Sequence, residues 1–185
     1  MNNKKSSILI HTCCAPCSAN VFKELEKDYQ VSCFFYNPNI WPEEEYKKRR
    51  DECKKYCKRI DISFIEPDEP FDYAQDKWSI YIEGLENEPE GGKRCKKCFE
   101  LRLTQTAEYA KKNGFDVFAT TLTISPHKNA VLINRIGEKV AGKFGIKFFK
   151  ADWKKNDGYK KSCEISRSED FYRQNYCGCK NSIRK

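Results

Sequence analysis

The chain has 185 residues and a formal net charge of +8, and 39% of its residues are hydrophobic while 34% are charged. This apolar content is enough for a sizeable core and excludes a disordered chain, and no apolar run approaches the roughly 20 residues of a membrane-spanning helix. The positive charge favours a polyanionic partner such as nucleic acid, because Lys and Arg side chains displace counterions from phosphates.

Five short runs with strand character alternate with helical patterns along the chain. Each run is rich in β-branched or aromatic residues, and they cover residues 7–10, 31–36, 62–65, 115–122 and 146–149. Alternation of this kind predicts a parallel sheet with helices on both faces. We therefore expect an α/β fold, namely a doubly wound, Rossmann-like (HUP-type) five-stranded sheet with strand order 3-2-1-4-5.

Four helices are predicted between these runs. The first follows the segment 11–18 directly, with Pro16 in its first turn, and the second covers residues 43–59, with acidic residues at its start and basic residues at its end. Two later helices end at Gly114 and Gly145. The apolar stripes of the first, third and fourth helices are Val21, Phe22, Leu25 and Tyr29; Phe99, Leu103, Ala107 and Ala110; and Leu132, Ile136, Val140 and Phe144.

Residues 66–94 break the alternation with prolines, glycines and acidic residues. A long loop of this kind is usually a lid or a binding loop, and the stretch 76–85 can hold a short helix. We expect one α/β domain over residues 1–185, with residues 1–5 flexible and residues 152–185 forming a cysteine-containing C-terminal extension over the site.

The N-terminus lacks an apolar region long enough for a signal peptide, so we expect a cytoplasmic protein with no membrane partner. Eleven cysteines cannot all pair in disulfides, because their number is odd. In a reducing compartment, closely spaced cysteines favour metal binding or catalysis over disulfide bonds. The cysteines are therefore the first candidates for the functional site.

Seven of the eleven cysteines are candidate metal ligands. Cys33, Cys53 and Cys57 fall on apolar faces, which predicts core thiols, and Cys163 is solitary. The remaining seven form three groups: Cys13, Cys14 and Cys17; Cys95 and Cys98; and Cys177 and Cys179. Four thiolates saturate one zinc ion or one iron–sulfur cluster, so seven indicate a cluster with a second metal or with a redox-active dithiol. A structural zinc site built from the last two pairs is the alternative.

A group of polar residues follows the fourth predicted strand. Ser125 is suited to the N-cap of a helix and Pro126 to its first turn, with His127 and Lys128 beside them. The free N–H groups of such a helix start can bind a phosphate of the substrate. In the expected strand order, this start and the cysteine loop face one crevice, whose edges would be lined by Asn37, Asn39 and Asp152. The alternative is an ordinary capped helix with a surface histidine.

Basic residues gather in the predicted helix 43–59, in the loop 93–97 and in the segment 154–161. Those of the helix are Lys47, Lys48, Arg49 and Arg50, and the aromatic residues near the last segment are Trp153, Tyr159, Tyr172 and Tyr176. RNA-binding surfaces combine cations for phosphates with aromatic rings for bases. We therefore predict an RNA-binding surface, with a solvated face as the alternative.

Six motifs occur together along the chain. They are His11-Thr-Cys-Cys-Ala-Pro-Cys17, Tyr36-Asn-Pro-Asn-Ile40, Lys93-Arg-Cys-Lys-Lys-Cys-Phe99 with Arg102-Leu103, Thr121-Leu-Thr-Ile-Ser-Pro-His-Lys-Asn129, Gly158-Tyr159, and Tyr172-Arg-Gln-Asn-Tyr-Cys-Gly-Cys179. In combination they resemble the epoxyqueuosine reductases called QueH, and the match extends over residues 11–182. The resemblance implies the two-electron reduction of the epoxide of epoxyqueuosine, at the wobble position of tRNA, to queuosine. It also implies an iron–sulfur enzyme that uses no cobalamin.

The residue inventory suits this chemistry. A 4Fe–4S cluster passes one electron at a time, so a second iron beside it could act as a Lewis acid and share the redox load. The cluster ligands would come from Cys13, Cys14, Cys95, Cys98, Cys177 and Cys179, with Cys17 as a further metal ligand. How the seven thiolates divide between the two centres stays open.

Three residues could donate protons, namely Asp152, Tyr159 and His127. The substrate or its RNA would contact Asn37, Ser125 and Lys128. The expected partners are tRNA carrying epoxyqueuosine and an electron donor of unknown identity. No ATP is expected, because no glycine-rich phosphate loop follows the first strand. An iron–sulfur tRNA sulfur-insertion enzyme and a zinc-stabilised RNA-binding module remain the alternatives.

Overall fold

The computed structural model describes residues 5–183, and its centre is a parallel sheet. The five strands in sheet order are β3 (Ser63–Ile65), β2 (Tyr29–Phe34), β1 (Ser6–His11), β4 (Val117–Thr120) and β5 (Lys147–Phe148). Every neighbouring pair is parallel. The predicted strand order is thus confirmed, and β1 lies between β2 and β4.

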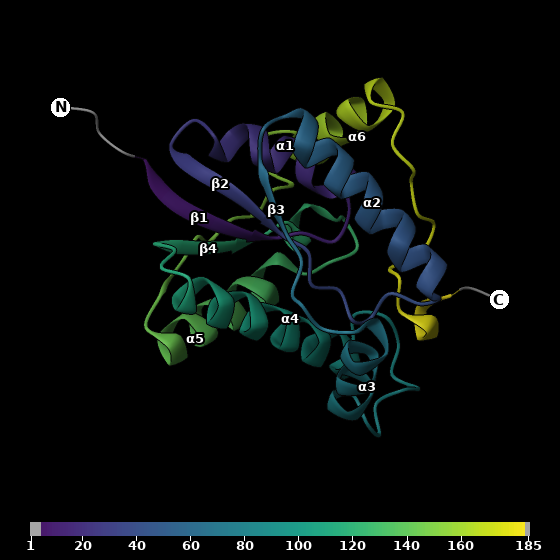
Figure 1. Cartoon of the computed structure of the whole chain (residues 1–185). Coiled ribbons are helices and arrows are strands. Elements are labelled where there is room, and N and C mark those ends of the chain that lie inside the picture. Colours follow the sequence, from purple (N-terminus) through teal and green to yellow (C-terminus); the bar gives the residue numbers. More distant parts are fainter. Residues whose placement is uncertain (1–4, 184–185) are drawn as a thin grey trace.

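Helices cover both faces of this sheet (Figure 1). One layer contains α1 (Ala15–Leu25) and α2 (Glu43–Arg59), and α6 (Gly158–Ser168) packs on α1. The other layer contains α4 (Lys93–Lys112) and α5 (Ala130–Phe144), and α3 (Phe71–Tyr81) packs against α4. Two 3₁₀ turns, η1 (Leu122–Ile124) and η2 (Lys180–Ser182), complete the described elements. This is the predicted doubly wound arrangement.

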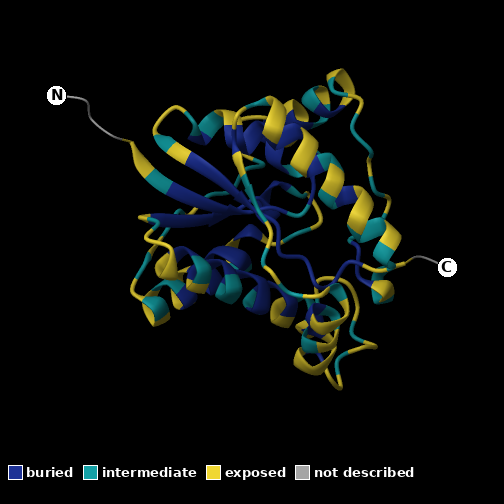
Figure 2. Cartoon of the chain, in the orientation of Figure 1, coloured by how far each residue is buried: buried dark blue, intermediate teal, exposed yellow. Residues whose placement is uncertain are grey.

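The core lies on both sides of the central strand. Ile8 and Ile10 of β1 face α1 and α2, whereas Leu9 faces α4 and α5, and all three side chains are fully buried. A strand covered on both faces needs such a continuous apolar run. Figure 2 shows the same pattern, with most of the central strands buried and the outer faces of the helices exposed.

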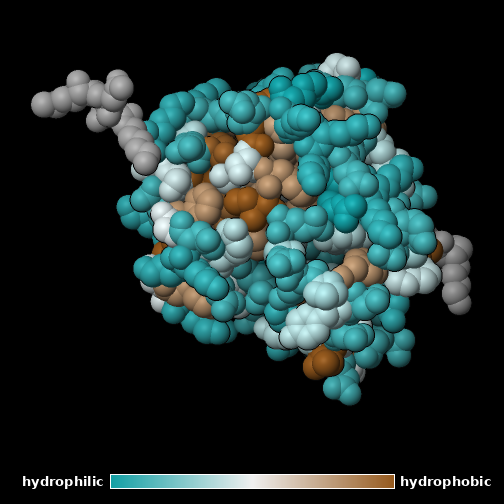
Figure 3. Space-filling model, in the orientation of Figure 1, coloured by the Kyte–Doolittle hydropathy of each residue, from teal (hydrophilic) through white to brown (hydrophobic). Residues whose placement is uncertain are grey.

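The outer surface is mostly hydrophilic. In Figure 3 apolar side chains show mainly in the gap between the two helical layers, with a small apolar spot over α3, a helix on which Ile80 is exposed. None of the described helices combines the length and the apolar character that crossing a bilayer requires. The proposed flexibility of residues 1–5 concerns mainly residues 1–4, which lie outside the described part of the chain.

Several predicted boundaries were wrong. Tyr29 is the first residue of β2 and does not continue the stripe of α1, which ends at Leu25. The fourth strand ends at Thr120, because the following residues turn into η1. The predicted helix within 76–85 is α3, which begins earlier, at Phe71, because Pro70 is suited to a helix start and Ala74 and Trp78 bury one face.

The predicted helix start at Ser125 was also wrong. Ser125 follows η1 with an extended backbone, and the helix α5 begins at Ala130. Its N-cap is Asn129, whose side-chain Oδ1 accepts a hydrogen bond from the backbone N–H of Leu132 at 3.0 Å. Asn caps a helix as well as Ser does, and here the turn made by residues 125–128 separates Ser125 from the helix. The expected phosphate site at a helix start beside Ser125 is therefore absent.

Replacing Phe22 by Ala should lower the free energy of unfolding by about 3–5 kcal/mol, because the side chain is fully buried between α1 and the sheet. Val131, which is 73% exposed on α5, provides the control, and Val131→Ala should change stability by no more than about 0.5 kcal/mol. Urea unfolding followed by circular dichroism measures both. Equal losses in the two variants would contradict the assigned core.

Candidate metal centre

Three cysteine sulfurs meet at the carboxyl end of the central strand. Cys14 is the N-cap of α1, and Pro16 occupies its first turn, so the chain turns sharply between β1 and α1. The sulfurs of Cys13, Cys14 and Cys17 all lie within 4.8 Å of one another. Thiolate ligands suit soft metals such as zinc and the iron of iron–sulfur clusters. This trio, which we call the loop trio, is able to hold a metal ion.

The three cysteines of the loop trio differ in pKa. The pKa of Cys13 lies well below its ordinary value, chiefly because Cys14 and Cys17 donate hydrogen bonds to its sulfur and also because Arg102 and Lys128 are positively charged. The same hydrogen bonds raise the pKa of Cys14 to about 12 and that of Cys17 well above its ordinary value. Within the loop trio, the thiolate form is therefore favoured most at Cys13.

A buried hydrogen-bonded network lies beneath the loop trio. Arg102 on α4 donates from Nε to His11 Nε2 at 3.1 Å and from Nη2 to Asn37 Oδ1 at 2.6 Å. Because Nε2 accepts, the proton of His11 sits on Nδ1, which donates to Thr120 Oγ1 at 3.0 Å. Asn37 in turn donates to the carbonyl of Thr12 at 2.8 Å. The network fixes the cysteine loop to β4, to α4 and to the segment after β2.

His11 is neutral in this network. Burial, followed by the nearby charge of Arg102, lowers its pKa to about 3. Both the nitrogen and the oxygen of the Asn37 side-chain amide are hydrogen-bonded. Asn37 is buried beneath the loop and does not line the cavity described below. The two residues hold the loop in place and do not face a ligand.

The other two cysteine groups come from the start of α4 and from the C-terminal segment. Cys95 Sγ accepts a hydrogen bond from the backbone N–H of Gly91 at 3.2 Å, and Cys98 is buried one turn later. Cys177 and Cys179 flank Gly178, whose φ of +109° favours glycine. A Cβ on Gly178 would lie 2.9 Å from Ile40 and 3.0 Å from Arg49, so the segment passes very close to α2.

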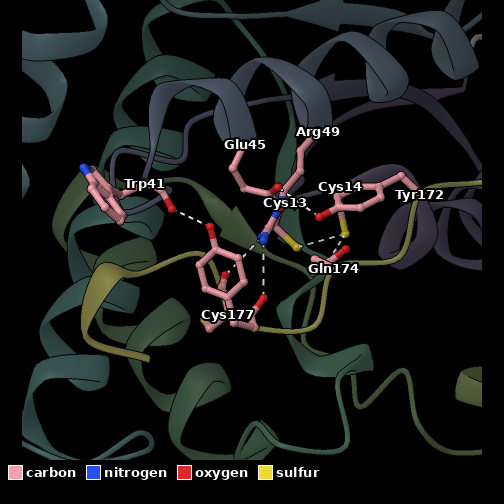
Figure 4. A network of polar contacts seen from close by, with 9 residues as sticks. Cys13, Cys14, Trp41, Glu45, Arg49, Tyr172, Gln174 and Cys177 are labelled. Atoms are coloured by element: carbon pink, nitrogen blue, oxygen red, sulfur yellow. Dashed lines mark hydrogen bonds and ion pairs between the residues drawn. The ribbon is translucent and has the colours of Figure 1, made fainter. Parts of the chain in front are cut away.

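Arg49 anchors the C-terminal segment to α2 (Figure 4). Its guanidinium pairs with Glu45 at 2.6 Å and donates to the carbonyls of Cys177 at 3.2 Å and Tyr176 at 3.3 Å. Glu45 also accepts a hydrogen bond from Tyr172 at 3.0 Å. The prediction that Arg49 belongs to an exposed basic surface was wrong, because the side chain is buried among these partners.

Further contacts tie the same segment to the cysteine loop and to the start of α2. Gln174 donates to Cys14 Sγ at 3.2 Å, and the hydroxyl of Tyr176 donates to the carbonyl of Trp41 (Figure 4). The segment therefore runs from the end of α6 to the loop trio.

A cavity of about 220 Å³ opens beside the cysteines. Among the residues that line it are Cys13, Cys17 and Cys177, and also Ser125, His127, Lys128 and Tyr159. Asp152 does not line the cavity and pairs with Lys154 at 2.9 Å. The cavity thus combines sulfur ligands with groups that can carry a proton or bind an anion.

The structure brings the seven predicted ligands together only in part. Within residues 5–183, the loop trio is the one group of three or more of the seven whose sulfurs all lie within 4.8 Å of one another. Cys177 shares the cavity with Cys13 and Cys17, and it is near enough to contribute to the raised pKa of Cys95 and of Cys98, although burial is the larger cause at both. The three groups therefore surround one region without forming a single closed sphere of sulfur atoms.

A second trio, Cys33, Cys53 and Cys57, meets between β2 and α2 with its sulfurs also within 4.8 Å. All three side chains are fully buried in the apolar core, as predicted. The pKa values of Cys33 and Cys53 lie well above their ordinary range because of burial and the neighbouring thiols. None of these residues lines the cavity beside the loop trio.

Sequence reasoning did not assign a structural role at the site to several residues that build it, namely His11, Arg49, Arg102, Thr120 and Gln174. Arg102 offered a signal, because it is a charged residue between Phe99 and Leu103 on the apolar stripe of a helix. A charge at such a position is buried and needs a partner. The role of Gln174 depends on a long-range contact that carries no periodic signal.

The comparisons with known proteins agree with this geometry. The model of the family described as Epoxyqueuosine reductase QueH matches residues 8–185. The chain is 43% identical over 179 residues to the Epoxyqueuosine reductase QueH of Acinetobacter baylyi, covering 96% of this chain and 80% of that protein. It is 41% identical over 181 residues to the Epoxyqueuosine reductase QueH of Streptococcus pyogenes serotype M1, covering 95% of this chain and 69% of that protein.

Among solved structures, a predicted subunit of tRNA methyltransferase from Methanocaldococcus jannaschii is similar in fold. The TM-score is 0.52 at 13% identity, covering 86% of this chain and 74% of that one. This likeness concerns the fold alone. The family match and the two bacterial relatives show that the chain belongs to the epoxyqueuosine reductase QueH family.

Proposed function

We propose that this protein reduces the epoxide of epoxyqueuosine in tRNA to the cyclopentene of queuosine. One observation carries the proposal beyond the family match: Cys13, Cys17 and Cys177, from opposite ends of the chain, line one cavity together with proton-carrying side chains. A purely structural metal site is closed by its ligands, whereas a reactive site leaves room for a substrate beside them. We place the reaction in the cytoplasm, with tRNA as the partner.

The cysteines suit an iron–sulfur centre. We propose that a 4Fe–4S cluster and a second iron draw their ligands from the loop trio and from Cys95, Cys98, Cys177 and Cys179. When bound, these groups would supply single electrons and a Lewis acid for the epoxide oxygen. Both C–O bonds of the epoxide break and a C=C bond forms, while two electrons from an external one-electron donor and two protons release the oxygen as water. The proposed epoxide reduction consumes no ATP and uses no cobalamin.

The side chains of the cavity would position the substrate and move the protons. Tyr159 and His127 line the cavity and are our proposed proton donors. Asp152 is less suited, since it lies outside the cavity and pairs with Lys154. Lys128 and Ser125 also line the cavity and would contact the substrate. Asn37 would act indirectly, by fixing the cysteine loop.

The outer face of α2 and the C-terminal segment would bind the RNA. Lys48 lies 3.5 Å from the centre of the Tyr172 ring, which combines a cation with an aromatic surface. Lys47 and Arg50 lie on the same helix, where Lys47 pairs with Glu43 and Arg50 with Asp51. Such contacts hold phosphates without reading sequence, so recognition of the modified base would fall to the cavity.

Cys13→Ser, Cys17→Ser and Cys177→Ser should each lower the iron content and abolish turnover, because each removes a proposed ligand. Cys53→Ala is the matched control: it should retain iron and activity while losing on the order of 1 kcal/mol of stability. Anaerobic iron analysis and an assay with an epoxyqueuosine-containing anticodon stem-loop, with dithionite as reductant, measure these effects. Full iron and full activity in Cys177→Ser would remove the C-terminal segment from the site.

Reduction should proceed at the same rate with and without ATP, because no glycine-rich phosphate loop follows β1. The measurement is turnover after exhaustive removal of nucleotide, with mass analysis of the RNA product. The product should be lighter by one oxygen atom. A requirement for ATP, or the appearance of sulfur in the RNA, would instead support a sulfur-insertion enzyme.

The triple variant Lys47→Ala, Lys48→Ala, Arg50→Ala should weaken tRNA binding and flatten its salt dependence, at unchanged iron content. Each lost phosphate contact should reduce the slope of log affinity against log salt by about 0.7–0.9. Arg49 is left intact because it is structural. The control is Lys139→Ala, Lys143→Ala on α5, in the opposite helical layer. An unchanged slope in the triple variant would move the RNA-binding surface elsewhere, for example to residues 154–161.

A further inference from the structure

Two buried guanidinium groups on α4 have no acidic partner. Arg94 is 2% exposed and Arg102 is 1% exposed. Across residues 5–183 neither side chain forms an ion pair with a carboxylate. Arg49 is equally buried, but its charge is balanced by Glu45. Arg94 and Arg102 therefore differ from Arg49, the third buried arginine among the described residues.

The hydrogen-bond partners of the two arginines are neutral. Arg94 donates to the carbonyls of Glu86, Glu88 and Asn181. Arg102 donates to His11, which is neutral, and to the amide oxygen of Asn37. These contacts engage part of the N–H groups of each guanidinium and leave the positive charges uncompensated. A buried charge without a counter-ion is strongly unfavourable, so a nearby anion is expected in the working protein.

The two arginines lie beside the proposed metal ligands. Arg94 immediately precedes Cys95, and Arg102 follows Cys98 by one helical turn. Arg102 also lines the cavity together with Cys13 and Cys177. Among the described residues that line the cavity, Glu90 is one carboxylate, and it forms no ion pair with either arginine, whereas Cys13, Cys17 and Cys177 are three potential thiolates. We therefore take thiolates to be the missing anions.

We propose that Arg94 and Arg102 are the fixed counter-charges of the metal centre, which stabilise its metal-bound thiolates and raise its reduction potential. This inference rests on the proposed iron–sulfur function. A cluster held by four thiolates is a net anion and becomes more negative on reduction, so a buried cation beside it favours the reduced state. The charge of Arg102 would thus help the centre accept electrons.

The second cysteine trio provides an internal comparison. Cys33, Cys53 and Cys57 are as close together as the loop trio, but they pack in the apolar core between β2 and α2. By contrast, Arg102 lines the cavity together with Cys13, and Arg94 directly precedes Cys95 on α4. Three thiolates among apolar side chains would be unfavourable without a cation. Buried positive charge thus distinguishes the proposed metal site from the core trio.

The test compares Arg102→Gln with Arg102→Lys. Glutamine removes the charge and keeps an amide donor, whereas lysine keeps the charge and loses the planar arrangement of N–H donors of the guanidinium group. In the anaerobically loaded protein, Arg102→Gln should lower the ratio of reduced to oxidised cluster at fixed solution potential by at least tenfold, or about 59 mV for a one-electron couple. Arg102→Lys should stay within threefold of the original protein. Lys139→Gln on α5 is the control for the loss of a remote charge, and it should leave the ratio unchanged.

A second measurement does not require an iron–sulfur cluster. Reduced metal-free protein is titrated with Co²⁺, and thiolate binding is followed by its charge-transfer absorption. Arg102→Gln and Arg94→Gln should weaken Co²⁺ binding at least tenfold, while Arg102→Lys should restore most of it. Cys53→Ala should leave the affinity unchanged.

The two measurements separate failure of this inference from failure of the proposed function. A protein that contains zinc and no sulfide would overturn the iron–sulfur function, while the Co²⁺ titration would still decide the role of the arginines. Equal losses in Arg102→Gln and Arg102→Lys would show that only the hydrogen-bonding fork matters and would overturn the counter-charge role. So would unchanged potential and unchanged Co²⁺ affinity in Arg102→Gln, provided that its circular dichroism shows a folded protein.

Discussion

The buried side chain of Arg102 is the interaction on which the site depends. It joins α4 to the end of β1 through His11 and to the segment after β2 through Asn37. His11 extends the connection to Thr120 at the end of β4. The strands β2, β1 and β4 are neighbours in the sheet, so their carboxyl ends converge at the point where the strand order reverses. One guanidinium thus fixes the place where an open α/β sheet binds its ligand.

A second buried arginine, Arg49, holds the C-terminal segment in place at the site. Arg49 holds the carbonyls of Tyr176 and Cys177 against α2, and Glu45 balances its charge. These contacts matter because the described residues after α6, 169–183, form no strand and only one short 3₁₀ turn. The two arginines therefore have different roles. Arg49 positions the C-terminal segment, whereas Arg102 fixes the cysteine loop and also supplies net positive charge beside the thiolates.

The fold could be predicted from the sequence because its signals are local and periodic. Ile8, Leu9 and Ile10 form the continuous apolar run of a strand covered on both faces, and such runs alternate with amphipathic helices. The cysteines of the site could be separated from core cysteines in the same way, since Cys53 and Cys57 fall on the apolar face of a helix. Their burial in the apolar core confirms the prediction that these two are core thiols.

Other features depend on choices that no local pattern decides. Ser125 and Asn129 are both good helix caps, and the 3₁₀ turn at residues 122–124 selects the second. Arg49 belongs to a run of four basic residues, but only its side chain turns inward, where Glu45 and two carbonyls of a distant segment meet it. Tyr176 and Cys177 lie more than a hundred residues from Arg49 along the chain. The role of Arg49 therefore becomes visible only in the tertiary structure.

The central claim is that buried positive charge and converging thiolates build a redox centre beside a substrate cavity. Iron and acid-labile sulfide, measured per chain in anaerobically purified protein, test it most directly. The account predicts a brown protein with about four sulfides and four to five irons per chain. A colourless protein with a single zinc ion and no sulfide would contradict it.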